Sequence, residues 1–379
     1  MHLDATVGGA VCAGSHGSSL HHGTLSDSVT DVRLATADGR ARWLLAEGGG
    51  GGGGEGAVAS DLLAAVRVSL GALGVVTAVE LALSPLCAVR RASERLPFRT
   101  ADDVSVLVAR ARASEHAWVH WRLGEGEAQL TVLERAAKPQ QLAGLQLAES
   151  LPSASLPAQS RPSGSQHLAG SRHAGSQCAA YDGLNWFATP AVLPDDGVGA
   201  DEAPTSAQPA AAPAAGSTEP LGGTAEVPAP SMEPAAAVWV SSEYALPLHS
   251  MADAVDALAA ALGESHRGRL VECKFAGKPA SASLLGCNGG GEVCCFNVWW
   301  RATWTSVDER AGATLRPFEE VMQRLGATPH WGKHHALPAR YVERVFGGRA
   351  ERFQAVARQL DPGGMFAPDW SHDVNIVNN

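Results

Sequence analysis

The chain has 379 residues, of which 45% are hydrophobic, so it is long enough for two ordinary domains with a substantial apolar core. Its formal net charge of −10 argues against nucleic acid or an anionic membrane surface as a partner, because both attract clustered Lys and Arg. The seven cysteines are odd in number and form no CxxC motif, which argues against a disulfide framework or a zinc site and favours a reducing compartment.

Residues 1–86 are predicted to form a compact segment of α/β structure. The dipeptide Asp38-Gly39 lies between two strand-like runs and is a strong hairpin signal. A run of glycines then interrupts the pattern, and Ser60 is expected to cap the next helix. The elements expected in this segment are two strands, a helix and a strand, at residues 29–36, 40–45, 61–68 and 75–83.

Residues 87–135 are predicted to begin a second lobe with a strand, a helix near residues 101–113 and two further strands. The following segment, residues 136–236, is dominated by Ala, Pro, Ser and Gly and loses all apolar periodicity. Such a composition cannot bury enough apolar surface to offset the entropy lost on ordering. We therefore expect a long disordered insert there.

Residues 237–379 are predicted to return to alternating strands and amphipathic helices. Strands are expected at residues 238–246, 269–275 and 292–301, and helices at residues 251–262, 313–325, 338–346 and up to about 360. Runs of strands with helices between them, rather than regular βαβ repeats, indicate the α+β class with an antiparallel sheet. No run reaches the roughly 20 apolar residues of a membrane span, so membrane association is not visible in the sequence, although it stays open.

The loop Gly14–Ser19, with Gly23 shortly after it, is rich in glycine and hydroxyl groups. Small residues let the backbone approach a ligand closely, and N–H and hydroxyl groups there can hold a diphosphate or the polar edge of a flavin. An ordinary turn-rich loop is the alternative interpretation. The histidines near this loop and near His330 lack the neighbouring ligands of a metal centre, so no metal site is predicted.

Charged residues in the second lobe offer further candidates. Lys333, in the phrase His-Trp-Gly-Lys, can place a fixed positive charge beside an electron-rich ring. Glu272 and Lys274 alternate along one strand and so share a face, where they could flank a polar substrate or form part of a solvated surface. Glu243, near a strand end, is interpreted as structural. The adjacent cysteines 294 and 295 are interpreted as small buried hydrophobic residues.

Two phrases of the first lobe resemble the FAD-linked sugar-lactone and alditol oxidases of the vanillyl-alcohol-oxidase superfamily. The stretch from Ala5 to Val29 resembles the second half of their FAD domain. The stretch Val68–Thr77 looks like the last helix-to-strand turn of that domain. The resemblance implies that residues 1–86 form a truncated FAD-binding lobe of the PCMH type, which matches only the later part of the family's FAD domain and lacks its N-terminal subdomain.

Five phrases of the second lobe resemble the same family in the same order, including its L-gulonolactone and D-arabinono-1,4-lactone oxidases. His116–Trp121 is similar to the family's first cap-domain strand, Trp239–Pro247 to its EYxxP strand, and Glu272–Lys274 to its Glu-x-Arg pair. Pro329–Lys333 is similar to its His-Trp-Gly-Lys signature, and Leu360–Phe366 to its closing DPxGxF phrase. The resemblance implies a cap lobe with an antiparallel sheet, built from residues 87–135 and 237–379 and interrupted by the insert 136–236.

The activity implied by the resemblance is FAD-dependent oxidation of a sugar 1,4-lactone or polyol at a CH–OH group, with oxygen as the acceptor. Lys333 would offset the charge that develops on the reduced flavin, and Glu272 and Lys274 would bind substrate hydroxyls. Lys274 stands where the family has arginine, which keeps the charge and loses the bidentate fork. The residues implied to contact the cofactor are Ser15, His16, Gly17, Ser18, Ser19, Gly23, Val76 and His330.

Two alternatives remain open at this stage. The chain could be a catalytically inactive relative that serves as a binding or scaffold protein, or a cytokinin- or D-lactate-type flavoenzyme built on the same FAD lobe. The His-Trp-Gly-Lys phrase speaks against the second alternative. The sequence does not fix the exact substrate or the compartment.

Overall fold

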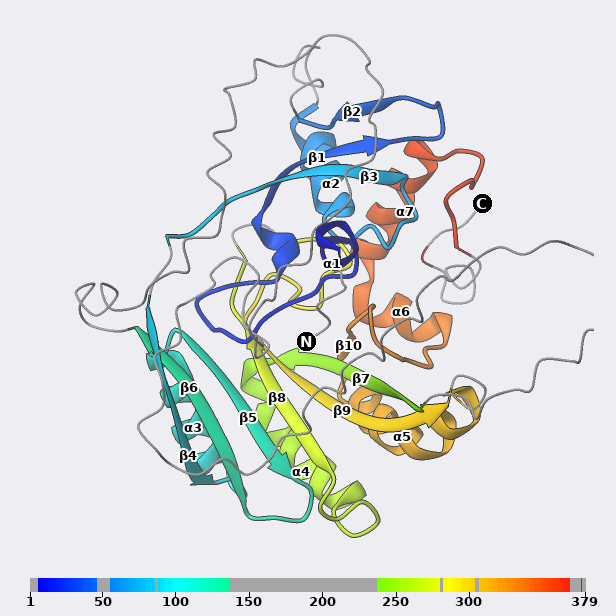
Figure 1. The fold of residues 1–379 in the computed structure, drawn as a ribbon. Helices are drawn as coiled ribbons and strands as arrows, with labels where there is room; N and C mark the ends of the chain where they lie inside the picture. The colour runs from blue at the N-terminus through cyan, green and yellow to red at the C-terminus, as the bar shows by residue number, and fades with distance from the viewer. Residues whose placement is uncertain are drawn as a thin grey trace, which may run out of the picture.

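A computed structural model describes the protein in seven parts, residues 6–45, 55–85, 88–135, 237–279, 282–303, 307–368 and 376. The expected disordered insert, residues 136–236, and the glycine run lie outside the described residues. The described chain forms a three-stranded sheet and a seven-stranded sheet, with helices packed against each (Figure 1). This arrangement confirms the α+β class.

The smaller sheet has the strand order β2-β1-β3, with both pairs antiparallel. The predicted hairpin is present, and Gly39 takes a φ of 76° in its turn, a conformation that favours glycine. Helix α2 begins at Glu55 and contains Ser60, so the prediction that Ser60 caps a helix from residue 61 was wrong. The elements of this part are α1 (Val7–Cys12), η1 (Leu25–Ser28), β1 (Val29–Ala35), β2 (Ala41–Trp43), α2 (Glu55–Val66) and β3 (Val75–Leu81).

The larger sheet has the order β10-β7-β9-β8-β5-β6-β4, and each pair of neighbours is antiparallel. The pairing of β5 with β8 joins the segments before and after residues 136–236 into one sheet. Its strands are β4 (Val89–Pro97), β5 (His116–Arg122), β6 (Glu127–Arg135), β7 (Ala237–Pro247), β8 (Leu270–Ala276), β9 (Val293–Thr303) and β10 (Thr328–Pro329).

Helices cover one face of the larger sheet, and the smaller sheet lies beyond its other face (Figure 1). The sheet-covering helices are α3 (Ala101–Ala113), α4 (Met251–Leu262) and α5 (Val307–Arg324), of which the last starts earlier than the predicted residue 313. A short turn, η3 (Leu248–Ser250), precedes α4. Helices α6 (Ala339–Phe346) and α7 (Gly348–Leu360) return the chain to the first lobe, where α7 packs against α2.

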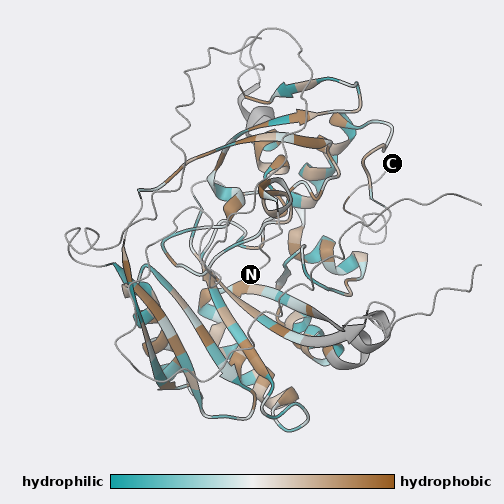
Figure 2. Ribbon diagram, viewed as in Figure 1, coloured by the Kyte–Doolittle hydropathy of each residue, from teal (hydrophilic) through white to brown (hydrophobic). Residues whose placement is uncertain are grey.

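The alternation of side chains along β8 and β9 separates an apolar face from a polar one. On β8, Val271, Cys273 and Phe275 are buried in the main core, and the residues between them face the opposite way. Figure 2 shows this alternation as brown and teal bands along the strands of the larger sheet. The helices therefore bury the apolar face, and the polar face is turned toward the first lobe.

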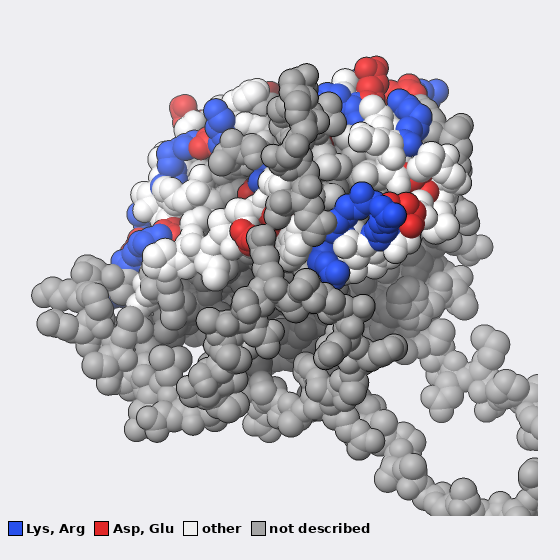
Figure 3. Space-filling view, turned by 90° about the horizontal axis from the view of Figure 1, so that it is seen from above, with Lys and Arg blue, Asp and Glu red and all other residues white. Residues whose placement is uncertain are grey.

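Within the described ranges, no helix has both the length and the apolar character needed to cross a membrane. Lys and Arg side chains are interspersed with Asp and Glu on the face seen from above (Figure 3).

Candidate functional site

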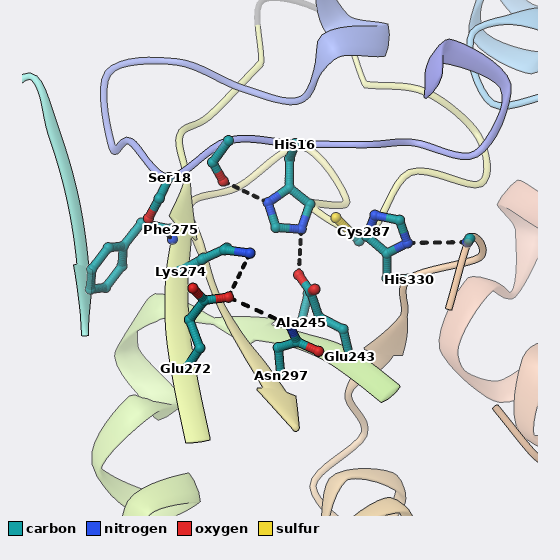
Figure 4. A network of polar contacts seen from close by, with 12 residues as sticks. His16, Ser18, Glu243, Ala245, Glu272, Lys274, Phe275, Cys287, Asn297 and His330 are labelled. Carbon is teal, nitrogen blue, oxygen red and sulfur yellow. Dashed lines mark hydrogen bonds and ion pairs between the residues drawn. The ribbon is translucent and has the colours of Figure 1, made fainter. Parts of the chain in front are cut away.

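Four polar side chains form a row across the polar face of the larger sheet. The strand registers place His120 opposite Glu272, Glu272 opposite Asn297, and Asn297 opposite Glu243. Directly opposite residues of antiparallel strands share one face of the sheet, so these four side chains lie side by side. We call them the polar row, and three of them are drawn in Figure 4.

Lys274 lies beside the polar row and is ion-paired with it. Its Nζ lies 2.6 Å from Glu272 Oε2, and the two side chains are only 19% and 12% exposed. Burial alone would raise the pKa of Glu272, but the charge of Lys274 and the hydrogen bonds from His120 and Lys274 lower it to about 2. Burial likewise opposes the charge on Lys274, while Glu272 and Glu243 raise its pKa overall. Both groups are therefore charged at neutral pH.

The glycine- and serine-rich loop of the first lobe covers this polar face, which is why it is not a solvated surface. Ser19 forms a parallel bridge with Ala276, and its backbone N donates to Phe275 O at 2.9 Å. The hydroxyl of Ser18 donates to Ala117 O and accepts from Phe275 N, and that of Ser19 donates to Glu115 O at 2.6 Å. These bonds fasten the loop across β5 and β8.

His16, from the same loop, points down onto the polar row. Its Nε2 lies 2.7 Å from Glu243 Oε1, and both side chains are 2% exposed (Figure 4). Its Nδ1 donates to Gly17 O at 2.8 Å. Burial would lower the pKa of His16, but the charge and hydrogen bond of Glu243 outweigh it and raise that pKa to about 9. His16 is therefore an imidazolium, held between two acceptors.

The His-Trp-Gly-Lys loop runs alongside the end of β7. His330 N donates to Glu243 O, and His334 N donates to Ser241 O, both at 2.9 Å. Within the loop, Lys333 N donates to His330 O at 3.0 Å, which closes a turn. Glu243 thus binds His16 through its side chain and the loop of Lys333 through its backbone.

His330 and Lys333 are both affected by burial in this loop. Burial lowers the pKa of His330 to about 3, and its Nδ1 accepts a hydrogen bond from Gly332 N at 3.1 Å. His330 is therefore neutral, with its hydrogen on Nε2. Burial also lowers the pKa of Lys333, although the carboxylates of Glu243 and Glu272 act in the opposite direction.

A cavity of about 550 Å³ lies between the first lobe and the His-Trp-Gly-Lys loop. Much of its wall has no side chain, since it is lined by Gly8, Gly9, Gly71, Gly74, Val76 and Trp331 among others. A Cβ added to Gly8 or Gly71 would meet no atom within 4 Å, so their Cα atoms face open space. A wall of this kind suits a flat ring system that approaches the backbone closely, and the residues present fit the expected flavin.

The residues predicted from the sequence fall into two groups. The structure brings together Glu272, Lys274, His16 and His330, which come from three separate segments, and Lys333 is joined to His330 by a backbone hydrogen bond. It places Val76 on the cavity wall.

The other predicted residues of the loop form backbone hydrogen bonds or hydrogen bonds to the strands of the larger sheet. Ser15 N donates to Ala10 O at 2.9 Å, and Gly17 O accepts from His16. Ser18 and Ser19 use their hydroxyls to hold the cap strands, as described above. Gly23 packs against Asp27, because an added Cβ would lie 2.4 Å from Asp27 Oδ2. Because Gly23 has no side chain, Asp27 has room to cap η1.

Three site residues were missed by reasoning from the sequence. Glu243 was interpreted as structural, and Asn297 and His120 were not singled out. Asn297 is fully buried, its Nδ2 lies 3.4 Å from Glu272 Oε2, and its Oδ1 has no hydrogen-bond partner among the described residues. A buried acceptor without a partner is a candidate contact for a ligand. Strand register brings these residues to the site, and no local pattern in the sequence reveals that register.

The chain is similar in sequence to several known oxidases. Residues 236–374 match the D-arabinono-1,4-lactone oxidase family. An alditol oxidase from a Streptomyces species is 28% identical over 380 residues, which cover 97% of this chain and 73% of that protein. L-gulonolactone oxidase from Scyliorhinus torazame is 39% identical over 49 residues, or 13% of this chain and 11% of that protein. The resemblance found in the sequence is thus confirmed.

The fold is also shared with a solved structure. Xylooligosaccharide oxidase from Myceliophthora thermophila superposes with a TM-score of 0.51 and 14% identity, over 98% of this chain and 71% of that one. At this level of identity the likeness concerns the fold alone. It agrees with the predicted α+β class.

Proposed function

We propose that this chain, whose residues 236–374 match the D-arabinono-1,4-lactone oxidase family, oxidises a CH–OH group of a polyol or sugar 1,4-lactone, with FAD as cofactor and oxygen as acceptor. The observation that carries the proposal is the buried polar row beside the His-Trp-Gly-Lys loop, which is bound to Glu243 through the backbone of His330. A row of charged and amide groups suits a ligand with several hydroxyls, and the same loop contributes Trp331 to the wall of the cavity.

The cofactor would lie in the glycine-lined cavity. Val76 of β3 lines this cavity, whereas Ser15, His16, Gly17, His330 and Lys333 lie outside its lining and stay predicted contacts of the cofactor. When bound, FAD supplies a hydride acceptor for the substrate carbon. The imidazolium of His16 and the ammonium of Lys333 would provide fixed positive charge where negative charge develops, at no cost of reorganisation during the reaction.

The substrate would lie on the polar row. The ionised carboxylate of Glu272 can accept hydrogen bonds from hydroxyl groups, and Lys274 can donate to their oxygens. Asn297 Oδ1 would gain the partner that it lacks in the described structure. His330 cannot act as a base at neutral pH, because its one free lone pair accepts from Gly332 N. Its role is to orient the loop that carries Lys333.

The purified full chain tests the proposal in two steps. Its visible absorption spectrum should contain the two bands of an oxidised flavin, and acid extraction should release FAD. Oxygen uptake with a panel of alditols, sugar lactones and 2-hydroxy acids should then respond to the first two classes. A colourless protein that takes up no FAD would overturn the proposal and favour a binding or scaffold role. A response to 2-hydroxy acids alone would favour the other flavoenzyme class.

A further inference from the structure

A pair of cysteines lies beside His16 at the edge of the candidate site. Cys287 comes from the loop between β8 and β9, and Cys295 comes from β9 itself. The two sulfur atoms and a ring nitrogen of His16 lie within 4.8 Å of one another. We propose that Cys287 and Cys295 form a peroxide-reactive thiol pair that closes into a disulfide next to the active centre.

The alternation of β9 separates Cys295 from the cysteine before it. Cys294 faces the helices, where its Sγ contacts Leu246 O at 3.7 Å within the main core. Cys295 faces the first lobe and packs with Cys287, Ala245 and two other small residues. The interpretation of both cysteines as inert hydrophobic residues therefore fits Cys294 and not Cys295.

Cys287 has the features of the attacking thiol. The neighbouring Cys295 and the charge of His16 lower the pKa of the Cys287 thiol, whereas burial and the carboxylates of Glu243 and Asp27 act in the opposite direction. Cys287 also keeps 7% of its surface exposed, against 1% for Cys295. Cys287 is thus the more accessible of the two thiols, as an attacking cysteine should be.

A metal centre at the same place fits less well. His16 Nε2 faces Glu243 at 2.7 Å, and its Nδ1 faces Gly17 O at 2.8 Å. Both ring nitrogens therefore donate hydrogen bonds, and the imidazolium has no lone pair for a metal ion. The cationic ring lies beside Cys287 and favours its thiolate, which is the form that reacts with a peroxide (Figure 4).

The proposed oxidant is hydrogen peroxide. The Cys287 thiolate attacks one peroxide oxygen, an S–O bond forms, the O–O bond breaks, and the leaving hydroxide takes up the proton that Cys287 released on ionising and becomes water. Cys295 then attacks the Cys287 sulfur, the S–S bond forms, the S–O bond breaks, and the hydroxide leaves as water with the Cys295 proton. In total, two thiols are oxidised to a disulfide and one peroxide is reduced to two waters.

The loop of Cys287 also holds the loop of Lys333. Thr328 Oγ1 donates to Cys287 O at 2.7 Å, and Trp331 Nε1 donates to Leu285 O at 2.8 Å. Drawing the Cys287 sulfur into bonding distance of Cys295 would shift these acceptors and with them the loop. The disulfide should therefore slow turnover. This consequence, and the enzyme as the source of peroxide, rest on the proposed function, but the thiol chemistry does not.

The test uses the full chain, purified under reducing conditions, and added hydrogen peroxide. Peptide mass spectrometry should find a Cys287–Cys295 disulfide that dithiothreitol reverses. Cys295→Ser should stop at a sulfenic acid on Cys287, which dimedone traps. Cys287→Ser should give neither product, and Cys294→Ser is the matched control that should form the disulfide like the wild type.

The inference is overturned if Cys287 and Cys295 keep free thiols at a peroxide concentration that oxidises an exposed model thiol. It is also overturned if Cys295→Ser gives no dimedone adduct on Cys287 while its circular dichroism matches the wild type. Neither readout needs flavin or substrate, so a chain that binds no FAD can still form the disulfide. Loss of oxygen uptake on disulfide formation, with recovery after reduction, tests the consequence separately.

Discussion

Glu243 Oε1 lies 2.7 Å from His16 Nε2, with both side chains buried, and this pair joins β7 of the larger sheet to the loop of the first lobe. The backbone O of Glu243 also accepts from His330 N. One residue therefore holds together three segments that are far apart in the sequence. Because the pair is buried, removing either partner leaves a charge without compensation.

We expect Glu243→Ala to lower the free energy of unfolding by about 3–5 kcal/mol, the usual cost of breaking a buried ion pair from one side. Urea denaturation followed by circular dichroism measures this change. The matched control is Glu264→Ala, which removes an exposed carboxylate paired with Arg267 and should cost about 1 kcal/mol or less. Equal effects of the two substitutions would contradict the role assigned to Glu243.

Stability should also depend on the protonation of His16. Its pKa is raised from 6.5 to about 9 in the folded protein, so the folded state binds the proton more tightly than the unfolded state. The contribution of protonated His16 to the free energy of unfolding is therefore complete below pH 6.5 and is lost as pH rises through about 9. Thermal unfolding across this range should show a fall in Tm. In His16→Gln the Tm should fall less with rising pH. If the Tm of this variant falls as steeply as that of the wild type, groups other than His16 cause the decrease.

Lys333→Ala should leave the fold intact and slow flavin reduction by about 10²- to 10³-fold, because it removes a preorganised charge from the site of charge development. Anaerobic stopped-flow bleaching of the flavin measures this rate. Lys278→Ala, at an exposed lysine outside the site, is the control and should react like the wild type. Unchanged bleaching in Lys333→Ala would refute the role.

Asn297→Ala should raise KM for a polyol by roughly fivefold to tenfold, since one hydrogen bond to a substrate hydroxyl contributes about 1 kcal/mol. The value of kcat should change less. Substrates that lack one hydroxyl identify the contact, because the effect of the substitution should vanish for the analogue that lacks the hydroxyl bound by Asn297. An equal rise in KM for every deoxy analogue would point to a general disturbance of the sheet.

Local patterns predicted much of the fold. The turn at Asp38-Gly39 and the helix Ala101–Ala113 are present as expected, because turn chemistry and helical periodicity are short-range properties. The start of α2 was wrong because Ser60 has cap chemistry in a place where the helix had already begun at Glu55. Side-chain preference alone cannot tell a cap from an internal serine.

The sequence by itself determined the α+β class, the resemblance to the sugar-lactone and alditol oxidases, and the shared face of Glu272 and Lys274, which follows from the two-residue period of a strand. Only the tertiary structure decided that this face is buried beneath the loop of His16, that Asn297 and Glu243 extend it, and that Cys295 meets Cys287. The physical reason is that these neighbours depend on strand register and on contacts between distant segments. Neither is encoded in any local pattern of residues.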